Sequence, residues 1–184
     1  MSLEKRTELT KLIRKQAKDK LNAINFQKNE NIIIALDLSK AKPGIVVFDK
    51  SKLEIILCTS LPGSTINKGF EVITLIESLI KKHKPGMIIF EEVFTRFISA
   101  ASKLLIYKGL VYNLTLNYKI EAYDICNKTA KRVVDAKTKE EAFANLSKYL
   151  KLELDFEEFN DELDALLLVL AYLVEGEKIL KKID

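Results

Sequence analysis

Cysteine, histidine and glycine are scarce in this chain of 184 residues, and each scarcity excludes a class of site. The two cysteines, Cys58 and Cys126, form no motif, so we expect free thiols in a reducing compartment. The single histidine, His83, has no Cys or His partner at ligand spacing, which excludes a structural zinc site. The six glycines form no phosphate-binding loop.

Long apolar runs are absent as well. The longest, Ala165–Val174, is too short to cross a bilayer and predicts a buried helix. The N-terminus is charged rather than apolar, so we expect no secretory signal. Hydrophobic residues make up 48% of the chain, which is enough for one ordinary core. These features predict a cytoplasmic protein without membrane association.

Charge is distributed unevenly although the net charge is only +4. Residues 1–30 hold eight basic and four acidic residues, a balance of +4, and residues 95–139 hold nine and three, a balance of +6. Residues 151–164 hold one lysine and seven acids. An enzyme that uses metal ions on a phosphate polymer needs such a basic surface beside an acidic cluster. An uneven soluble surface is the plainer interpretation, and composition alone favours it.

Hydrophobic periodicity predicts an α/β fold. Five β-rich runs lie at 32–37, 44–49, 53–59, 87–91 and 119–123. Helical patterns lie at 70–82, 98–117, 128–134, 139–149 and 160–179, the last with Asn160 as N-cap. Three antiparallel strands followed by βαβ units predict a mixed five-stranded sheet with helices on both faces. Residues 1–28 predict an additional helix, so we divide the chain into an extension, 1–30, and one domain, 31–184.

Acidic residues stand at the ends of buried segments. Asp37 ends the first strand, where a bare carboxylate is costly to bury unless a cation compensates it. Glu91 and Glu92 point to opposite faces of the sheet, so only one can join Asp37. Asp161 and Asp164 have the i, i+3 spacing that shares one helix face. Carboxylates that converge in this way suit Mg²⁺ or Mn²⁺.

Each acid also has a plainer interpretation. Asp161 interacts favourably with a helix N-terminal dipole, and Asp37 can cap a turn through its side chain. All of the acids together, in this order of elements, favour a metal site.

Three segments resemble those of the RuvC-type Holliday-junction resolvases, in particular bacteriophage members, within the RNase H-like superfamily. Ile33–Asp37 resembles the segment of the first catalytic aspartate, and Ile88–Phe94 resembles the second acidic segment, which selects Glu91. Asp161–Leu166 resembles the closing Asp-x-x-Asp-Ala-Leu. The similarity spans roughly residues 31–175.

The resemblance implies an RNase H-like fold and hydrolysis of branched DNA by a homodimer. It implies no organic cofactor, but two Mg²⁺ ions about 4 Å apart, with Mn²⁺ as the alternative. The implied metal ligands and catalytic residues are Asp37, Glu91, Asp161 and Asp164. The implied DNA contacts are Phe94, Arg96, Lys103, Lys128, Lys131 and Arg132. The helix at 98–116 would lie at the dimer interface. A core position for Phe94 remains equally open.

One departure and three alternatives stand beside this resemblance. Leu38-Ser39 follows Asp37 where the bacterial family has Pro-Gly, so that turn is rebuilt. The same acids would serve a nuclease that acts on RNA or on RNA–DNA hybrids. A non-catalytic DNA-binding relative could keep the fold. An actin-like ATP-binding protein shares the first elements but would need glycine-rich phosphate loops.

Overall fold

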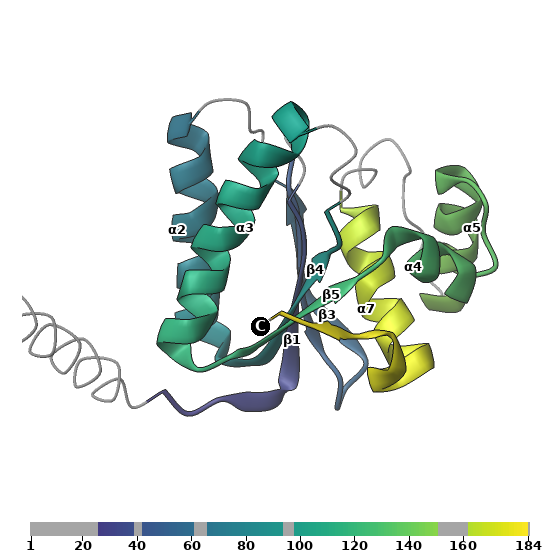
Figure 1. Ribbon diagram of the computed structural model, residues 1–184. Coiled ribbons are helices and arrows are strands. Elements are labelled where there is room, and N and C mark those ends of the chain that lie inside the picture. The colour runs from purple at the N-terminus through teal and green to yellow at the C-terminus, as the bar shows by residue number, and fades with distance from the viewer. Residues whose placement is uncertain (1–25, 39–41, 61–65, 94–97, 151–161, 184) are drawn as a thin grey trace, which may run out of the picture.

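The structure is a computed structural model that describes residues 26–38, 42–60, 66–93, 98–150 and 162–183. A mixed sheet forms the middle layer, and helices cover both of its faces (Figure 1). The strands are β1 (Asn29–Asp37), β2 (Gly44–Asp49), β3 (Glu54–Ser60), β4 (Pro85–Glu91), β5 (Glu121–Ile125) and β6 (Lys181–Lys182). The helices are α2 (Ile66–His83), α3 (Ile98–Tyr118), α4 (Asn127–Val133), α5 (Lys139–Leu150), α7 (Leu163–Glu175) and the short 3₁₀ helix η1 (Gly176–Ile179).

The strand order in the sheet is β3-β2-β1-β4-β5-β6. Strands β1, β4 and β5 are parallel to one another, whereas the pairs β1–β2, β2–β3 and β5–β6 are antiparallel. The predicted α/β fold with a mixed sheet is therefore confirmed, but the predicted count of five strands is wrong. The sixth strand, β6, has two residues and pairs with the edge of β5. A strand of that length is too short to carry a period-2 pattern.

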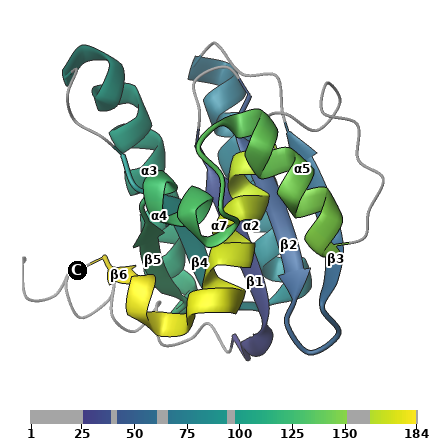
Figure 2. The same cartoon turned by 90° about the vertical axis from the view of Figure 1, so that its right-hand side faces the viewer.

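From Ile32 to Leu36, strand β1 is buried on both faces, which explains the unbroken apolar run there. Ile34 and Leu36 belong to the core beneath α2 and α3. Ile33 and Ala35 belong to the opposite core, beneath α4, α5 and α7. Figure 2 shows the second of these faces, with α7 in front of the sheet. The two cores together fix which face each side chain of β1 and β4 occupies.

Several boundaries differ from the predictions. Strand β1 begins at Asn29, inside the predicted extension 1–30. Of the helix predicted over residues 1–28, residues 26–28 are described and are not helical, and residues 1–25 lie outside the described residues. The fifth strand begins at Glu121 because Lys119 adopts a left-handed turn, with φ of 56°, after α3. The last helix ends at Glu175 because Gly176 adopts a φ of 67°.

Two further observations concern the cysteines and membrane-spanning helices. Both cysteines are free, as predicted. None of the helices in the described part of the chain combines the length and apolar character that a membrane crossing requires.

Candidate active site

Asp37 and Glu91 end two neighbouring parallel strands. The register pairs Leu36 of β1 with Phe90 of β4, so Asp37 and Glu91 are the next residues along their strands. Leu36 and Phe90 lie in the core beneath α2 and α3. Because side chains alternate along a strand, Asp37 and Glu91 point to the other face, toward α7. Their carboxyl groups share a hydrogen bond there.

Asp164 joins them from the first turn of α7. Its side chain is only 15% exposed, and its Oδ2 lies 3.0 Å from the Nζ of Lys139, the first residue of α5. Its other oxygen, Oδ1, is buried without a hydrogen-bond partner in the described structure. The negative charge of Asp164 acts on Asp37 and raises the pKa of that carboxyl group. The structure therefore brings Asp37, Glu91 and Asp164 together from three distant segments.

Burial and like charge dominate the electrostatics of this cluster. Burial is the largest cause that raises the pKa of Asp37, from its ordinary 3.8 to about 8, and the charges of Glu91 and Asp164 add to it. The ammonium of Lys139 opposes the shift. At neutral pH the cluster thus carries more negative charge than the protein compensates, which holds a proton on Asp37. A carboxyl pKa that burial and like charges displace this far is typical of functional sites.

Two side chains in this site were not predicted. Asn127, the first residue of α4, donates a hydrogen bond from Nδ2 to Oε1 of Glu91 over 2.7 Å. Lys139 forms the ion pair with Asp164. Periodicity predicted that helices begin near both positions, but the direction in which a helix projects its first residue depends on tertiary packing. Both residues hold an acid in place, and Lys139 also supplies positive charge.

Glu162 and Glu92 do not join the three acids. Glu162 precedes α7 and is 7% exposed. It lies near Cys58 on β3, where burial of the thiol raises its pKa to about 12 and the charge of Glu162 adds to the shift. Glu92 follows β4, and its carboxylate lies 2.6 Å from the Nζ of Lys181. Alternation along β4 directs Glu92 to the face opposite Glu91.

The predicted DNA contacts have different outcomes. Lys128 and Arg132 are exposed on α4, and Lys131 is half-buried there. Helix α4 begins at the residue that contacts Glu91, so its basic side chains lie on an element adjoining the acids. Lys103 belongs to α3, but its side chain is not described. The remaining predicted site residues, Phe94, Arg96 and Asp161, lie outside the described residues.

The donor set fits a hard divalent cation. Three carboxylates supply the oxygen ligands that Mg²⁺ and Mn²⁺ prefer. The unpartnered Oδ1 of Asp164 and the proton held on Asp37 both indicate positive charge that the site lacks. Within the described residues, however, no group of three or more acidic, His or Cys side chains stands in a ligating arrangement. Asn127 and Lys139 instead contact one oxygen each of Glu91 and Asp164.

Comparison with known proteins identifies the class of fold by structure and not by sequence. No protein-family model matches the sequence, and no curated protein is similar to it in sequence. The described sheet and helices nevertheless have the α/β fold of solved Holliday-junction resolvases.

Individual structures make the likeness specific. RuvC of Thermus thermophilus, solved in complex with a Holliday junction substrate, superposes with a TM-score of 0.71 at 16% identity, over 83% of this chain and 99% of that one. Another Thermus thermophilus RuvC structure gives a TM-score of 0.68 with the same identity and coverage. The yeast mitochondrial Holliday junction resolvase Ydc2 gives 0.51 at 10% identity, over 88% of this chain and 86% of that one. At these identities the likeness establishes the fold.

Proposed function

We propose that this chain is a divalent-cation-dependent endonuclease that hydrolyses DNA phosphodiesters at branched structures such as Holliday junctions. The observation that carries the proposal is the convergence of Asp37, Glu91 and Asp164 at the carboxyl ends of β1 and β4. The fold is shared with a RuvC that was solved in complex with a Holliday junction substrate, and this supports branched DNA as the proposed substrate. Ligands of open α/β sheets bind at this carboxyl edge.

The proposed ligands of the cation are Asp37, Glu91, Asp164 and, from outside the described residues, Asp161. Mg²⁺ is the proposed ion, with Mn²⁺ as the alternative. When bound, such an ion supplies water activation and charge stabilisation at the phosphate. Asn127 orients Glu91 through its hydrogen bond. Lys139 forms an ion pair with Asp164. With a cation bound to Asp164, the ammonium of Lys139 would be available to offset the charge of a phosphate.

The proposed DNA surface adjoins these acids. The exposed Lys128 and Arg132 on α4, with Lys131 beside them, would hold backbone phosphates. Phe94, Arg96 and Lys103 belong to the same proposed surface, on the segment that joins β4 to α3 and in α3 itself. Contacts of this kind position the protein on DNA without reading its sequence.

We also propose a homodimer that covers one face of α3. Four large apolar side chains there are exposed by 39% to 61%: Leu105, Ile106, Leu110 and Leu116. Gly109, on the same helix, has open space beside it. A second copy would bury this face and bring two sets of acids to one junction, as paired nicking requires. Analytical ultracentrifugation of wild type and of Ile106→Lys would test this, with a monomer expected only for the variant.

The proposed activity is tested by comparing substrates in Mg²⁺. Labelled four-way junction, flap, linear duplex and RNA–DNA hybrid would be incubated with wild type, Asp37→Asn and Glu121→Gln. Glu121 begins β5, at the opposite end of the parallel strands, and is a matched control. We expect junction cleavage by wild type and Glu121→Gln, and junction binding without cleavage by Asp37→Asn.

Other outcomes identify the alternatives. Preferred cleavage of the hybrid would indicate a nuclease that acts on RNA. Junction binding without cleavage by wild type, in Mg²⁺ and in Mn²⁺, would indicate a non-catalytic relative. Cleavage by Asp37→Asn at the wild-type rate would contradict the assignment of the site.

A further inference from the structure

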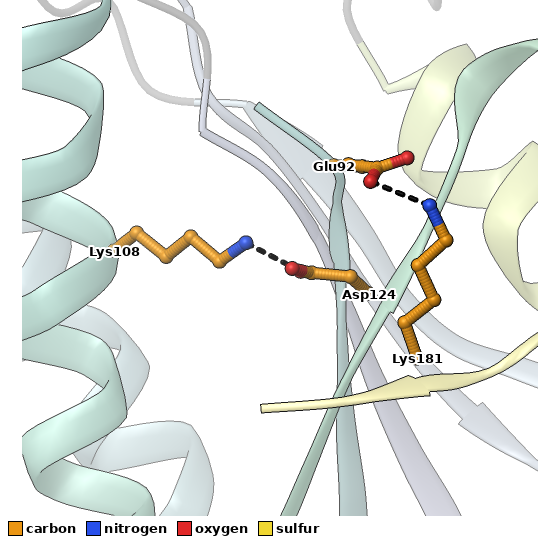
Figure 3. Close-up of polar contacts among 4 residues, drawn as sticks. All are labelled: Glu92, Lys108, Asp124 and Lys181. Atoms are coloured by element: carbon orange, nitrogen blue, oxygen red, sulfur yellow. Dashed lines mark hydrogen bonds and ion pairs between the residues drawn. The ribbon is translucent and has the colours of Figure 1, made fainter. Parts of the chain in front are cut away.

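Four charged side chains of alternating sign lie close together near the end of β4, and Lys108 reaches Asp124 from the helix side (Figure 3). Lys108 of α3 pairs with Asp124 of β5, and Lys181 of β6 pairs with Glu92. The proposed active site uses none of these residues. Glu92 connects them to the proposed active site, because it directly follows Glu91 in the chain.

The location of Lys181 is determined by its neighbours. The register of β5 and β6 places Lys181 opposite Asp124. Lys108, whose side chain is only 13% exposed, pairs with Asp124 from the helix side. Lys181 instead reaches Glu92, with 2.6 Å between its Nζ and the carboxylate oxygen. The ion pair therefore ties β6 to the residue beyond β4.

Strand β6 is itself held in place just beyond Lys181. The backbone N–H of Ile183 donates to the carbonyl of Ala122 on β5 over 3.2 Å. The hydroxyl of Tyr112 on α3 donates to the carbonyl of Ile183 over 3.1 Å. Lys181 thus projects from an anchored backbone.

The backbone of Glu92 continues the sheet beyond the end of β4. Its N–H donates to the carbonyl of Ile125 over 3.0 Å, one step past the pairing of Glu91 with Ile125. Glu91 therefore lies between Phe90, which is buried, and Glu92, which is held by a backbone hydrogen bond and an ion pair. Two adjacent carboxylates end this strand, and a rotation of the strand end would exchange their faces.

We propose that Lys181 is a positioning residue for Glu91. By holding Glu92, Lys181 fixes the end of β4 and keeps the Glu91 carboxylate directed at Asp37 and Asp164. This inference deepens the proposed function and rests on it, because Glu91 is the residue that Lys181 serves.

Amide hydrogen exchange tests the positioning without any cleavage. Lys181→Met removes the charge at similar length, and Lys181→Arg keeps it. We expect the Glu92 amide to exchange about two- to fivefold faster in Lys181→Met, which is the worth of one exposed ion pair, and to stay near wild type in Lys181→Arg. Lys178→Met removes a comparable exposed pair with Glu175 and should leave the Glu92 amide unchanged. Equal exchange in wild type and Lys181→Met would overturn the proposal.

Single-turnover cleavage of a four-way junction supplies the second readout. Lys181→Met should lower the cleavage rate at saturating enzyme by about threefold to tenfold, because a displaced catalytic group is costly, while the Kd for the junction stays unchanged. Glu92→Gln should have the same effect, and the double variant should be no worse than either single one, since both remove the same pair.

Contrary outcomes separate the two proposals. If Lys181→Met weakens junction binding but not the rate at saturation, Lys181 is a phosphate contact and the positioning role is wrong. If the effects of the two substitutions multiply, they do not act as one pair. If wild type cleaves no substrate, the proposed function fails, whereas the exchange of the Glu92 amide still decides whether Lys181 holds the strand end.

Discussion

Asp37→Asn should make the protein more stable in the absence of divalent cations. The pKa of Asp37 lies at about 8 in the folded chain against an ordinary 3.8. A carboxyl pKa that is higher in the folded chain than in the unfolded chain lowers the free energy of unfolding. This loss is absent below pH 3.8, grows as the carboxyl group ionises in the unfolded chain, and becomes constant above pH 8. At about 1.4 kcal/mol for each pH unit, the cost at pH 7 is about 4 kcal/mol. Asparagine keeps the shape of the protonated carboxyl group and can still donate to Glu91, so it removes most of this cost.

Denaturant unfolding in EDTA measures the effect. The gain in the free energy of unfolding from Asp37→Asn should be small at pH 5 and several times larger at pH 8. Asp49→Asn is the matched control, because the carboxylate of Asp49 accepts bonds from the N–H and hydroxyl of Ser51, over 2.8 Å and 2.6 Å. These bonds lower the pKa of Asp49, so its substitution should destabilise the protein at both pH values. A loss of stability in Asp37→Asn at pH 8 would refute the reasoning.

Three further predictions concern the neighbours of the acids. Asn127→Ala removes the donor that orients Glu91. It should lower the junction cleavage rate at saturation by about tenfold, because losing a hydrogen bond that supports a metal ligand has an effect of that size. An unchanged rate would argue against that role. Lys139→Met removes the ammonium that lowers the pKa of Asp37, so NMR titration of that carboxyl carbon should give a higher pKa than in wild type, and an equal or lower one would contradict the site electrostatics. Lys128→Ala and Arg132→Ala should each reduce the slope of log affinity against log salt by about one, and an unaltered slope would place that side chain away from phosphate.

The parts of the fold that depend on local pattern could be predicted from the sequence. Strands β1 and β4 are long apolar runs that end in acids, and burial on both faces makes such runs visible. Strand β6 could not be predicted, because its two residues are lysines without any strand-forming pattern. They form a strand only because they pair with β5 and because Lys181 forms an ion pair with Glu92. The start of β5 was misplaced because nothing local marks Lys119 as the left-handed residue that ends α3.

The candidate site could be predicted only in part, for a related reason. Strand alternation and helix spacing are local, and they predict that Asp37, one of the adjacent pair Glu91 and Glu92, and Asp164 meet at one edge; the choice of Glu91 comes from the resemblance to RuvC-type resolvases. Asn127 and Lys139 belong to helices whose orientation is set by packing against α7 and the sheet. No periodicity in the sequence records which way their first residues point.

Crystals soaked in Mn²⁺ would test most directly whether the three carboxylates form a cation site. Anomalous difference density should appear between Asp37, Glu91 and Asp164, with the ammonium of Lys139 withdrawn from Asp164. Crystals of Asp37→Asn under the same conditions should lose or greatly weaken that density. Mn²⁺ density elsewhere on the wild-type protein, with none among these three side chains, would contradict the proposed metal site.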